Sequence, residues 1–352
     1  MKFQLQNGLS SLLAAGFAGA MLAGAAQAAD FTMKVSHVAS TAQPVYTCVE
    51  VMKSYIERLS RGRVEVQHYP AAQLGHFRQS VEQVQVGSLE LTFTTGGGIS
   101  NLFGPIQAFD IPYLFRSDRV VDKIMDDPII NGTLRKDLLE ATKTVRLMGI
   151  TGDHGWRSFI TNRDVKVASD LEGLKVRTIE SPISMELARA LGANPTPIPW
   201  QELYTSLGTG IVNGTKNSVS DVLDMSFTDY IKFAVLDKHT FTFFFWYTND
   251  NWIKSLPADM QKVVLDGFRA MKVTCDGYID AAMLPKWKKW EELGGKIHIP
   301  SAEEKKTFLP GQKAVADWFV SQYGDSYYKM IQAAVQRAEV AIDAEDKAVL
   351  GN

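Results

Sequence analysis

Hydrophobic positions in the first third of the chain alternate between two spacings. The segment Met33–Val38 reads as a short strand, and the apolar residues of Val45–Leu59 then recur every three or four positions, as on one buried face of a helix. The same sequence of patterns continues with a strand over Val64–Pro70, a helix over Phe77–Val84 and a strand over Leu89–Phe93. This order of strands and helices predicts an α/β fold with parallel strands.

Glycines mark the ends of several of these elements. Gly62 is placed to end the first helix and Gly87 the second, because glycine readily adopts the left-handed conformation at a helix C-terminus. Three consecutive glycines, Gly96–Gly98, follow the third strand. Such a run favours a loop in which the backbone approaches a bound molecule or another segment closely, although a phosphate-binding turn is an alternative.

Strand patterns return in the middle of the chain. Two separate strands are predicted at Val145–Thr151 and Trp156–Thr161, and the most apolar stretch, Phe241–Tyr247, has the length of a strand. Ser181 followed by Pro182 is typical of a helix start, with serine as the cap and proline at the first helical position.

The last third of the chain has mainly helical patterns. After a short helix at Gln201–Leu207, a long helical region is predicted over Pro257–Leu293, with a kink or break at Pro285 because proline lacks the backbone N–H. The segment Ser301–Glu304 forms a capping box that begins a C-terminal helix. The tail to Asn352 is predicted to be helical and solvated.

The first 28 residues resemble a secretory signal peptide. Lys2 is their only charged residue, an apolar stretch covers Leu9–Ala23, and Ala26–Ala28 forms an A-x-A cleavage pattern. The alternative is an N-terminal membrane anchor, but the apolar stretch is short and rich in glycine and alanine. We therefore expect cleavage before Ala29 and a periplasmic protein that is soluble after cleavage.

Charge and cysteine content narrow the function classes. The 352 residues contain 37 basic and 39 acidic side chains, so no basic surface for nucleic acid is expected. The two cysteines exclude a disulfide-rich scaffold and a multi-thiolate metal site. Two interpretations of Cys48 and Cys275 remain open: a disulfide formed after export, or two small apolar residues on helices.

A search for catalytic motifs finds little. The sequence lacks a nucleophile elbow, a zinc-protease motif, a Walker A loop and a C-x-x-C pair, and the six histidines are scattered. His154 with Asp153 is the best acid–base pair, yet nothing near it supplies a nucleophile. We expect no catalytic site, no metal site and no cofactor. An exported α/β protein of this kind is more often a binding protein.

Six short segments occur along the chain in a fixed order. They are Tyr69–Gly75 (YPAAQLG), Ile111–Phe115 (IPYLF), Gly155–Arg163 (GWRSFITNR), Leu171–Arg177 (LEGLKVR), Gly192–Pro197 (GANPTP) and Glu202–Tyr204 (ELY). In order and spacing these segments resemble the periplasmic solute-binding proteins of tripartite ATP-independent periplasmic (TRAP) transporters, the DctP family. The resemblance covers nearly the whole chain after residue 28.

The resemblance implies that three residues hold the carboxylate of a small ligand. Arg177 ends the segment LEGLKVR, Arg157 lies twenty residues before it, and Asn217 forty residues after it. A guanidinium group matches a carboxylate with two parallel hydrogen bonds, which agrees with such a role. Without the resemblance, Arg177 would be read as a surface arginine at the end of a strand.

The sequence departs from the family pattern just before Asn217. The family has acidic residues at two positions where this chain has Asn213 and Lys216. A lysine facing the site would favour a second acidic group or a sulfonate on the ligand, whereas a lysine facing outward would change nothing. The sequence does not distinguish these orientations.

Further binding candidates are weaker. Trp200 stands where the family often has an aromatic residue against the ligand, although packing in the core is an equal alternative. Thr94, Thr95 and His37 follow predicted strands and are placed to donate hydrogen bonds, and Glu180 follows Arg177 closely. The Phe-rich stretch Phe241–Trp246 is expected to form a crossing strand, with one face in the core and one aromatic residue in the cleft.

The implied fold has two α/β domains with crossing strands, a hinge and a long helix that spans both domains. The expected boundaries are 29–154 for domain I, to which about 243–282 return, and 155–242 for domain II, with about 283–352 forming C-terminal helices that pack across it. The ligand would lie between the domains, and its binding would close the hinge.

The resemblance implies a function in transport. The protein would capture a small organic acid as a monomer and deliver it to the membrane subunits of a TRAP permease, without chemistry of its own. Alternatives are a sulfonate or dicarboxylate ligand, an exported hydrolase that uses His154 and Asp153, and a sensing domain that signals to a membrane receptor.

Overall fold

A computed structural model describes residues 28–351 of the chain, so the predicted signal peptide lies outside the described residues except for its last position. The strands are β1 (Phe31–Ser36), β2 (Val64–Tyr69), β3 (Leu91–Thr94), β4 (Val145–Thr161), β5 (Lys175–Thr178), β6 (Asn194–Pro197), β7 (Gly214–Asn217), β8 (Phe233–Asn249) and β9 (Lys296–His298).

Helices connect and cover these strands. The α-helices are α1 (Pro44–Leu59), α2 (Phe77–Val86), α3 (Asp118–Met125), α4 (Pro128–Thr142), α5 (Pro182–Ala190), α6 (Leu203–Gly208), α7 (Val219–Asp224), α8 (Asp250–Ser255), α9 (Ala258–Glu292), α10 (Ala302–Lys306), α11 (Pro310–Tyr323) and α12 (Ser326–Leu350). Short 3₁₀ helices are η1 (Gly96–Ile99), η2 (Gly104–Asp110), η3 (Ala168–Leu171), η4 (Trp200–Glu202) and η5 (Phe227–Asp229).

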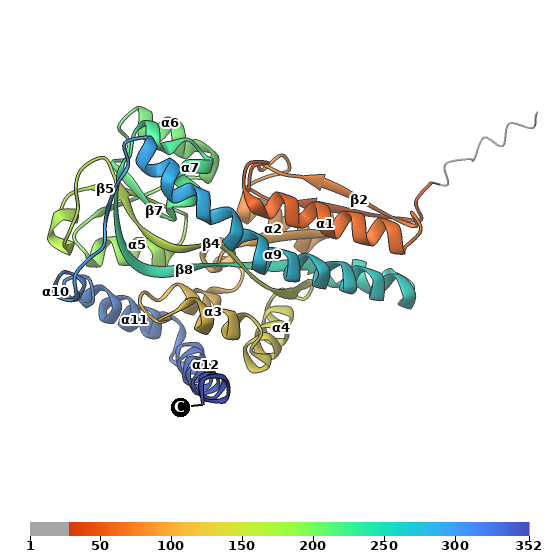
Figure 1. Cartoon of the computed structure of the whole chain (residues 1–352). Helices are drawn as coiled ribbons and strands as arrows, with labels where there is room; N and C mark the ends of the chain where they lie inside the picture. The colour runs from red at the N-terminus through yellow and green to blue at the C-terminus, as the bar shows by residue number, and fades with distance from the viewer. Residues whose placement is uncertain (1–27, 352) are drawn as a thin grey trace, which may run out of the picture.

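All strands belong to one mixed sheet with the order β2-β1-β3-β8-β4-β7-β5-β6, and β9 pairs with β8. The predicted parallel pairing in the first part is confirmed for β1 with β2 and for β1 with β3. The two long strands, β4 and β8, are antiparallel and cross from one half of the molecule to the other (Figure 1). The exact domain boundaries stay a prediction.

The two strands predicted at 145–151 and 156–161 are a single strand, β4. Its pairing with β8 is interrupted between Gly152 and Trp156 and is shifted again between Arg157 and Phe159. The polar, glycine-containing segment between the two apolar runs looks like a loop in the sequence. Pairing with β8 on both sides of this segment keeps the chain extended through it, with a bulge in between.

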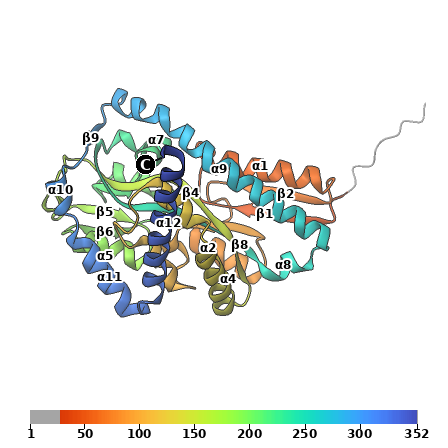
Figure 2. The same cartoon turned by 60° about the horizontal axis from the view of Figure 1, so that its bottom comes forward.

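Helix α9 spans both halves of the molecule. It packs on α1 and β4 at one end and on α7 at the other, as Figure 2 shows. The helix continues through Pro285, so of the predicted kink or break the break is wrong, and the kink stays a prediction. A disulfide joins Cys48 on α1 to Cys275 on α9, with 5.6 Å between their Cα atoms, which answers the question that the sequence left open.

The local start and stop signals act mostly as predicted. Gly87 ends α2 with φ of 78°, and Ser301 and Glu304 exchange the two hydrogen bonds of a capping box at α10. Ser181 stands at the cap position of α5, but its hydroxyl donates to Gln107 instead of capping the helix.

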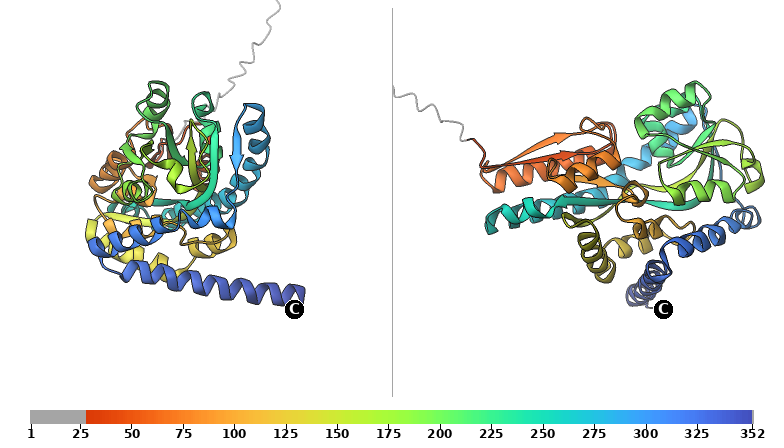
Figure 3. Two further views of the ribbon diagram at one scale, coloured as in Figure 1. Left: turned by 90° about the vertical axis from the view of Figure 1, so that its left-hand side faces the viewer. Right: turned by 180° about the vertical axis from the view of Figure 1, so that it is seen from behind.

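The C-terminal tail is helical, as predicted, but it is not wholly solvated. Helix α12 lies against α3, α4 and η2 along one side of the molecule (Figure 3). It buries Ile331, Ala334, Val335 and Ala338, which recur at helical spacing. This face belongs to the largest apolar cluster of the core, which also contains the side chains of β8 on that side of the sheet.

Candidate functional site

A small cavity lies where the carboxyl ends of parallel strands from the two halves meet. Open α/β sheets commonly bind ligands at such strand ends. One half contributes residues that follow β1 and β3, and the other contributes residues of β5, β7 and the segments after them. The lining residues are Val38, Ala39, Gln43, Phe77, Thr95, Arg157, Arg177, Ile179, Trp200, Asn217, Asp221 and Phe244.

Arg177 is the most deeply placed cation of this cavity. Its side chain is only 2% exposed, and its Nε donates to the backbone oxygen of Ile198 at 2.9 Å. Its Nη2 is buried and has no hydrogen-bond partner among the described residues. Burial and repulsion from Arg157 lower the pKa of Arg177 to about 9, whereas Asp221 raises it, so the group stays cationic at neutral pH.

Arg157 is held from two sides. From β4, its Nε donates to Thr242 Oγ1 on β8 at 3.0 Å, and its Nη1 donates to the backbone oxygen of Lys216 at 3.5 Å. These bonds fix the guanidinium against the cavity wall that it shares with Arg177. Arg157 and Arg177 lie twenty positions apart in the sequence, and the structure brings them to the same cavity wall.

Asn217 is buried at the end of β7, and its amide is oriented by two neighbours. Its Oδ1 accepts from Thr215 Oγ1 at 2.7 Å, and its Nδ2 donates to Asp221 Oδ2 at 3.0 Å. One hydrogen of the Nδ2 group is left for a further acceptor in the cavity. The three residues predicted to hold a carboxylate thus line one cavity.

Trp200 both packs in the core and lines the cavity, so the two alternatives for this residue are combined. Its ring meets Phe227 edge to face, with 5.2 Å between the ring centroids. On the cavity side, its ring lies beneath the guanidinium of Arg177. Phe244 on β8 is the aromatic residue that the Phe-rich strand contributes to the cavity.

Two polar residues of the cavity, Gln43 and Asp221, were missed from the sequence. Asp221 accepts from Gln43 Nε2 at 3.3 Å, which joins the start of α1 in one half to α7 in the other. Asp221 also closes a capping box with Ser218 at the start of α7. The S-x-x-D pattern of residues 218–221 was the available signal, but it indicates a helix start, not a cavity residue.

The remaining candidate binding residues differ in their position relative to the cavity. Thr95 lines the cavity, and its buried Oγ1 has no hydrogen-bond partner within the described chain. Thr94 is buried beside it, but its hydroxyl donates to the backbone oxygen of Thr95 and does not line the cavity. Glu180 is exposed at the wider mouth, which His76, Gly97 and Gly98 also line.

His37 is buried behind the cavity and does not line it. Its Nε2 lies 2.7 Å from Nε2 of His68, and its ring stacks on Phe93. Burial and the neighbouring His68 lower the pKa of His37 to about 3, so its ring is neutral. The structure therefore gives His37 a packing position behind the cavity.

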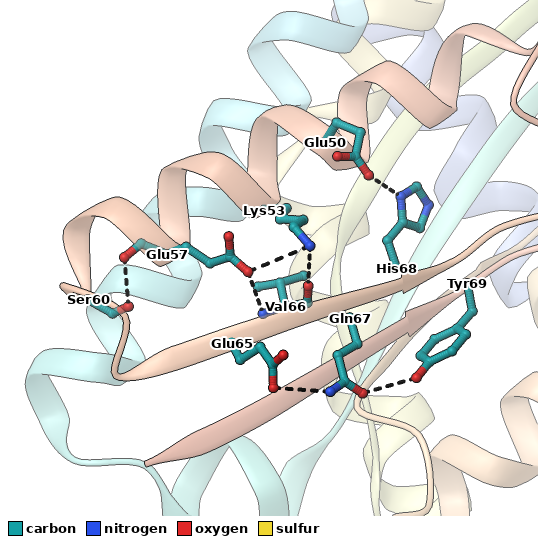
Figure 4. A network of polar contacts seen from close by, with 9 residues as sticks. All are labelled: Glu50, Lys53, Glu57, Ser60, Glu65, Val66, Gln67, His68 and Tyr69. Atoms are coloured by element: carbon teal, nitrogen blue, oxygen red, sulfur yellow. Dashed lines mark hydrogen bonds and ion pairs between the residues drawn. The ribbon is translucent and has the colours of Figure 1, made fainter. Parts of the chain in front are cut away.

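Figure 4 shows the contact between α1 and β2 that supports this position. Glu50 Oε1 lies 2.6 Å from Nδ1 of His68 and orients the second imidazole. Further along the helix, Lys53 Nζ donates to the backbone oxygen of Val66, and Glu57 Oε1 accepts from the backbone N–H of Val66.

The glycine run after β3 forms η1 at the mouth of the cavity. A Cβ atom on Gly97 would lie 2.4 Å from Ser181 Oγ, so glycine is required for the close approach of η1 to the start of α5. This confirms the interpretation of the run as a close backbone approach. The mouth is bridged by Gln201, whose Nε2 donates to the backbone oxygen of Val38 and whose Oε1 lies 2.8 Å from His76 Nδ1.

A smaller compartment continues from the cavity beyond Arg157. Lys216 lines it together with Asp110, and the side chain of Lys216 is only 6% exposed. Lys216 thus faces inward, which the sequence did not decide. Burial and repulsion from Arg157 lower the pKa of Lys216 to about 7, whereas Asp110 and Asp237 raise it.

Two features are absent between residues 28 and 351: a metal-binding cluster and a membrane-spanning helix. The described residues hold no group of three or more histidine, cysteine, aspartate or glutamate side chains suited to a metal ion. No helix in that part of the chain combines the length and apolar character needed to cross a bilayer. The side chains of Asp153 and His154 lie outside the described residues.

Residues 35–322 match the model of a protein family described as bacterial extracellular solute-binding protein, family 7 (DctP). A solute-binding protein of Verminephrobacter eiseniae is 32% identical over 248 residues, which cover 70% of this chain and 72% of that protein. The C4-dicarboxylate-binding periplasmic protein of Rhodobacter capsulatus is 27% identical over 67% of this chain and 70% of its own length.

The fold also matches solved structures. A TRAP periplasmic solute-binding protein from a Polaromonas species, solved with bound D-erythronate, has a TM-score of 0.78 and 25% identity, covering 86% of this chain and 98% of that one. This match confirms the two-domain α/β fold with crossing strands. The family consists of solute-binding proteins of transporters, not of enzymes. The chain belongs to family 7 of the bacterial extracellular solute-binding proteins, the DctP family of TRAP periplasmic binding proteins.

Proposed function

We propose that this protein captures a small organic acid in the cavity between its two halves and delivers it to the membrane subunits of a TRAP permease. The ligand carboxylate pairs with Arg177 and Arg157 and accepts a hydrogen bond from Asn217. Trp200 packs beside the ligand, and Thr95 donates to it. Closure of the two halves around the ligand excludes water and strengthens the ion pair.

The observation that carries this proposal is the buried Nη2 of Arg177, which has no partner within the described part of the chain. A buried guanidinium donor without an acceptor is costly, because it has lost water without gaining a protein partner. A ligand carboxylate supplies the missing acceptor with the bidentate geometry that arginine favours. The relatives support this class of ligand, since one is named for C4-dicarboxylates and another was solved with D-erythronate.

The proposed function requires that the protein is exported to the periplasm. Cleavage after the pattern Ala26–Ala28 would release the protein into the periplasm, where TRAP binding proteins of this family act. Mass spectrometry of the protein recovered from the periplasm should give a chain that begins at Ala29. A chain that retains its first 28 residues and sediments with membranes would contradict this part of the proposal.

Binding is tested by thermal shift and calorimetry over a panel of organic acids, sulfonates, and neutral and cationic controls. A ligand at about 100 times its Kd stabilises the folded protein by about 2.7 kcal/mol. We expect stabilisation by at least one carboxylate, lost in Arg177→Ala and kept in Arg189→Ala, an exposed arginine on α5. Stabilisation by neutral or cationic compounds alone would overturn the proposal.

Delivery to a permease is tested separately from binding. The protein is added to proteoliposomes that contain the membrane subunits of a TRAP permease from the same organism, with the radiolabelled acid that the binding assay identifies. We expect uptake only when the binding protein is present. Binding without any permease-dependent uptake would favour the sensing alternative over transport.

A further inference from the structure

The small compartment beyond Arg157 contains an unusual pair of side chains. Lys216 comes from β7 and Asp110 from the end of η2, and both line the compartment. Thr95, Ser184 and Thr240 complete its polar lining. The compartment adjoins the main cavity through Arg157 and Thr95, which line both.

The charges of the whole cavity nearly balance. Its cationic side chains are Arg157, Arg177 and Lys216, and its acidic side chains are Asp110 and Asp221. With all five groups ionised, the lining carries one net positive charge. A ligand with one negative charge neutralises the site, whereas a second charge would be buried without compensation.

The chemistry of the pair selects a hydroxyl group. A lysine ammonium only donates hydrogen bonds, and an ionised carboxylate only accepts them. A hydroxyl does both, so it accepts from Lys216 while it donates to Asp110. A second carboxylate or a sulfonate placed there would meet the repulsion of Asp110, which is held in the same compartment. The buried Oγ1 of Thr95, which has no partner in the described structure, provides another hydroxyl contact.

We propose that Lys216 and Asp110 form a hydroxyl-binding subsite, and that the ligand is a singly charged hydroxycarboxylic acid, not a dicarboxylate or a sulfonate. This inference rests on the proposed function, because it needs a carboxylate at Arg177 and Arg157 to set the ligand's position. The inward Lys216 therefore determines specificity through a hydroxyl and not through a second anion.

The test compares three acids of the same carbon number by calorimetry: D-erythronate, butyrate and succinate. The wild-type protein should bind D-erythronate at least about tenfold more tightly than butyrate, and more tightly than succinate. Lys216→Met should reduce the ratio of D-erythronate to butyrate affinity by about tenfold. Lys175→Met, an exposed lysine on β5, is the matched control and should leave the ratio unchanged.

Asp110→Asn provides a second test, because it removes the charge that repels a second anion. It should shift the preference toward succinate. The inference is overturned if the wild type prefers succinate, if Lys216→Met leaves the ratio as it was, or if none of the three acids binds at millimolar concentration. The proposed function fails on a different result: Arg177→Ala binds whichever acid the wild type binds.

Discussion

The guanidinium of Arg177 lies over the indole ring of Trp200, with 5.3 Å between its central carbon and the ring centroid. The aromatic face attracts the cation and holds its plane. Since Nε of Arg177 is committed to the backbone oxygen of Ile198, the ring and the backbone together aim the remaining donors into the cavity. Trp200 thus positions Arg177 as well as lining the cavity.

Replacing Trp200 by leucine should weaken acid binding through loss of this positioning. A desolvated cation–aromatic contact is worth about 1–2 kcal/mol, which corresponds to roughly a five- to thirtyfold loss in affinity. Trp200→Phe keeps an aromatic face and should retain most of the affinity. Calorimetry with the identified acid measures both variants, and equal losses in the two would argue against a role for the ring face.

Arg177→Lys should bind the acid far more weakly although it keeps a positive charge. A lysine cannot present two parallel donors or stack its plane on Trp200, so the bidentate pairing is lost. The loss of a buried, hydrogen-bonded charge contact costs about 2–5 kcal/mol, or roughly thirty- to several-thousandfold in affinity. Near wild-type affinity in this variant would show that charge alone holds the ligand.

Acid binding should weaken as the pH rises through about 7. Burial lowers the pKa of Lys216 to about 7, so the apo protein loses this positive charge as the pH increases. A bound anion favours the protonated amine, so binding takes up protons and the affinity falls with rising pH. The other charged groups that act on the amine are Arg157, Arg177, Asp110 and Asp237.

Calorimetry between about pH 6 and pH 8 checks this dependence, because a typical ligand carboxylic acid is ionised throughout that range. Lys216→Met should remove most of the slope. An affinity that rises with pH, or an equal slope in the variant, would contradict the assignment of the titrating group to Lys216.

Reduction of the Cys48–Cys275 disulfide should destabilise the protein. The bond joins α1 to α9 across 227 positions of sequence, and loss of a native disulfide typically costs about 2–5 kcal/mol. The melting temperature should fall when dithiothreitol is added. A Cys48→Ala and Cys275→Ala double variant should melt lower without reductant and show no further response to it.

Asp237→Asn should unfold more easily than Tyr113→Phe. The buried carboxylate accepts from Tyr113 Oη at 2.8 Å and from His239 Nδ1 at 2.9 Å, so each bond to this charged acceptor contributes about 1.5–3 kcal/mol. Removal of the carboxylate charge weakens both bonds, whereas Tyr113→Phe removes one. Chemical denaturation compares the two, and a larger loss in Tyr113→Phe would refute this ranking.

Much of the fold follows from local patterns. The period of apolar residues, together with Gly87 and the capping box at Ser301, places α1, α2 and α10 within a few residues. Local patterns failed where a long-range partner decides the structure. Strand β4 is continuous through residues 152–155 because β8 runs alongside, and α9 continues through Pro285 in a helix that packs on both halves.

The residues of the candidate site were likewise predicted only where a local motif marks them. Arg177, Arg157 and Asn217 were predicted from their motifs, and the structure brings them to one cavity. Asp110 on η2 and Asp221 on α7 were not predicted as site residues, because no local sequence pattern indicates that η2 or α7 packs beside β5.

The sequence by itself determined the α/β class, the limits of helices such as α1 and α2, the family, and the three residues proposed to hold a carboxylate, since these depend on short-range periodicity and on motifs whose order is readable along the chain. Only the tertiary structure decided that Lys216 faces inward and that His37 does not reach the cavity. It also decided that the two cysteines are joined. Each of these depends on which distant segment fills the space beside a side chain, and close packing of the whole chain is what settles it.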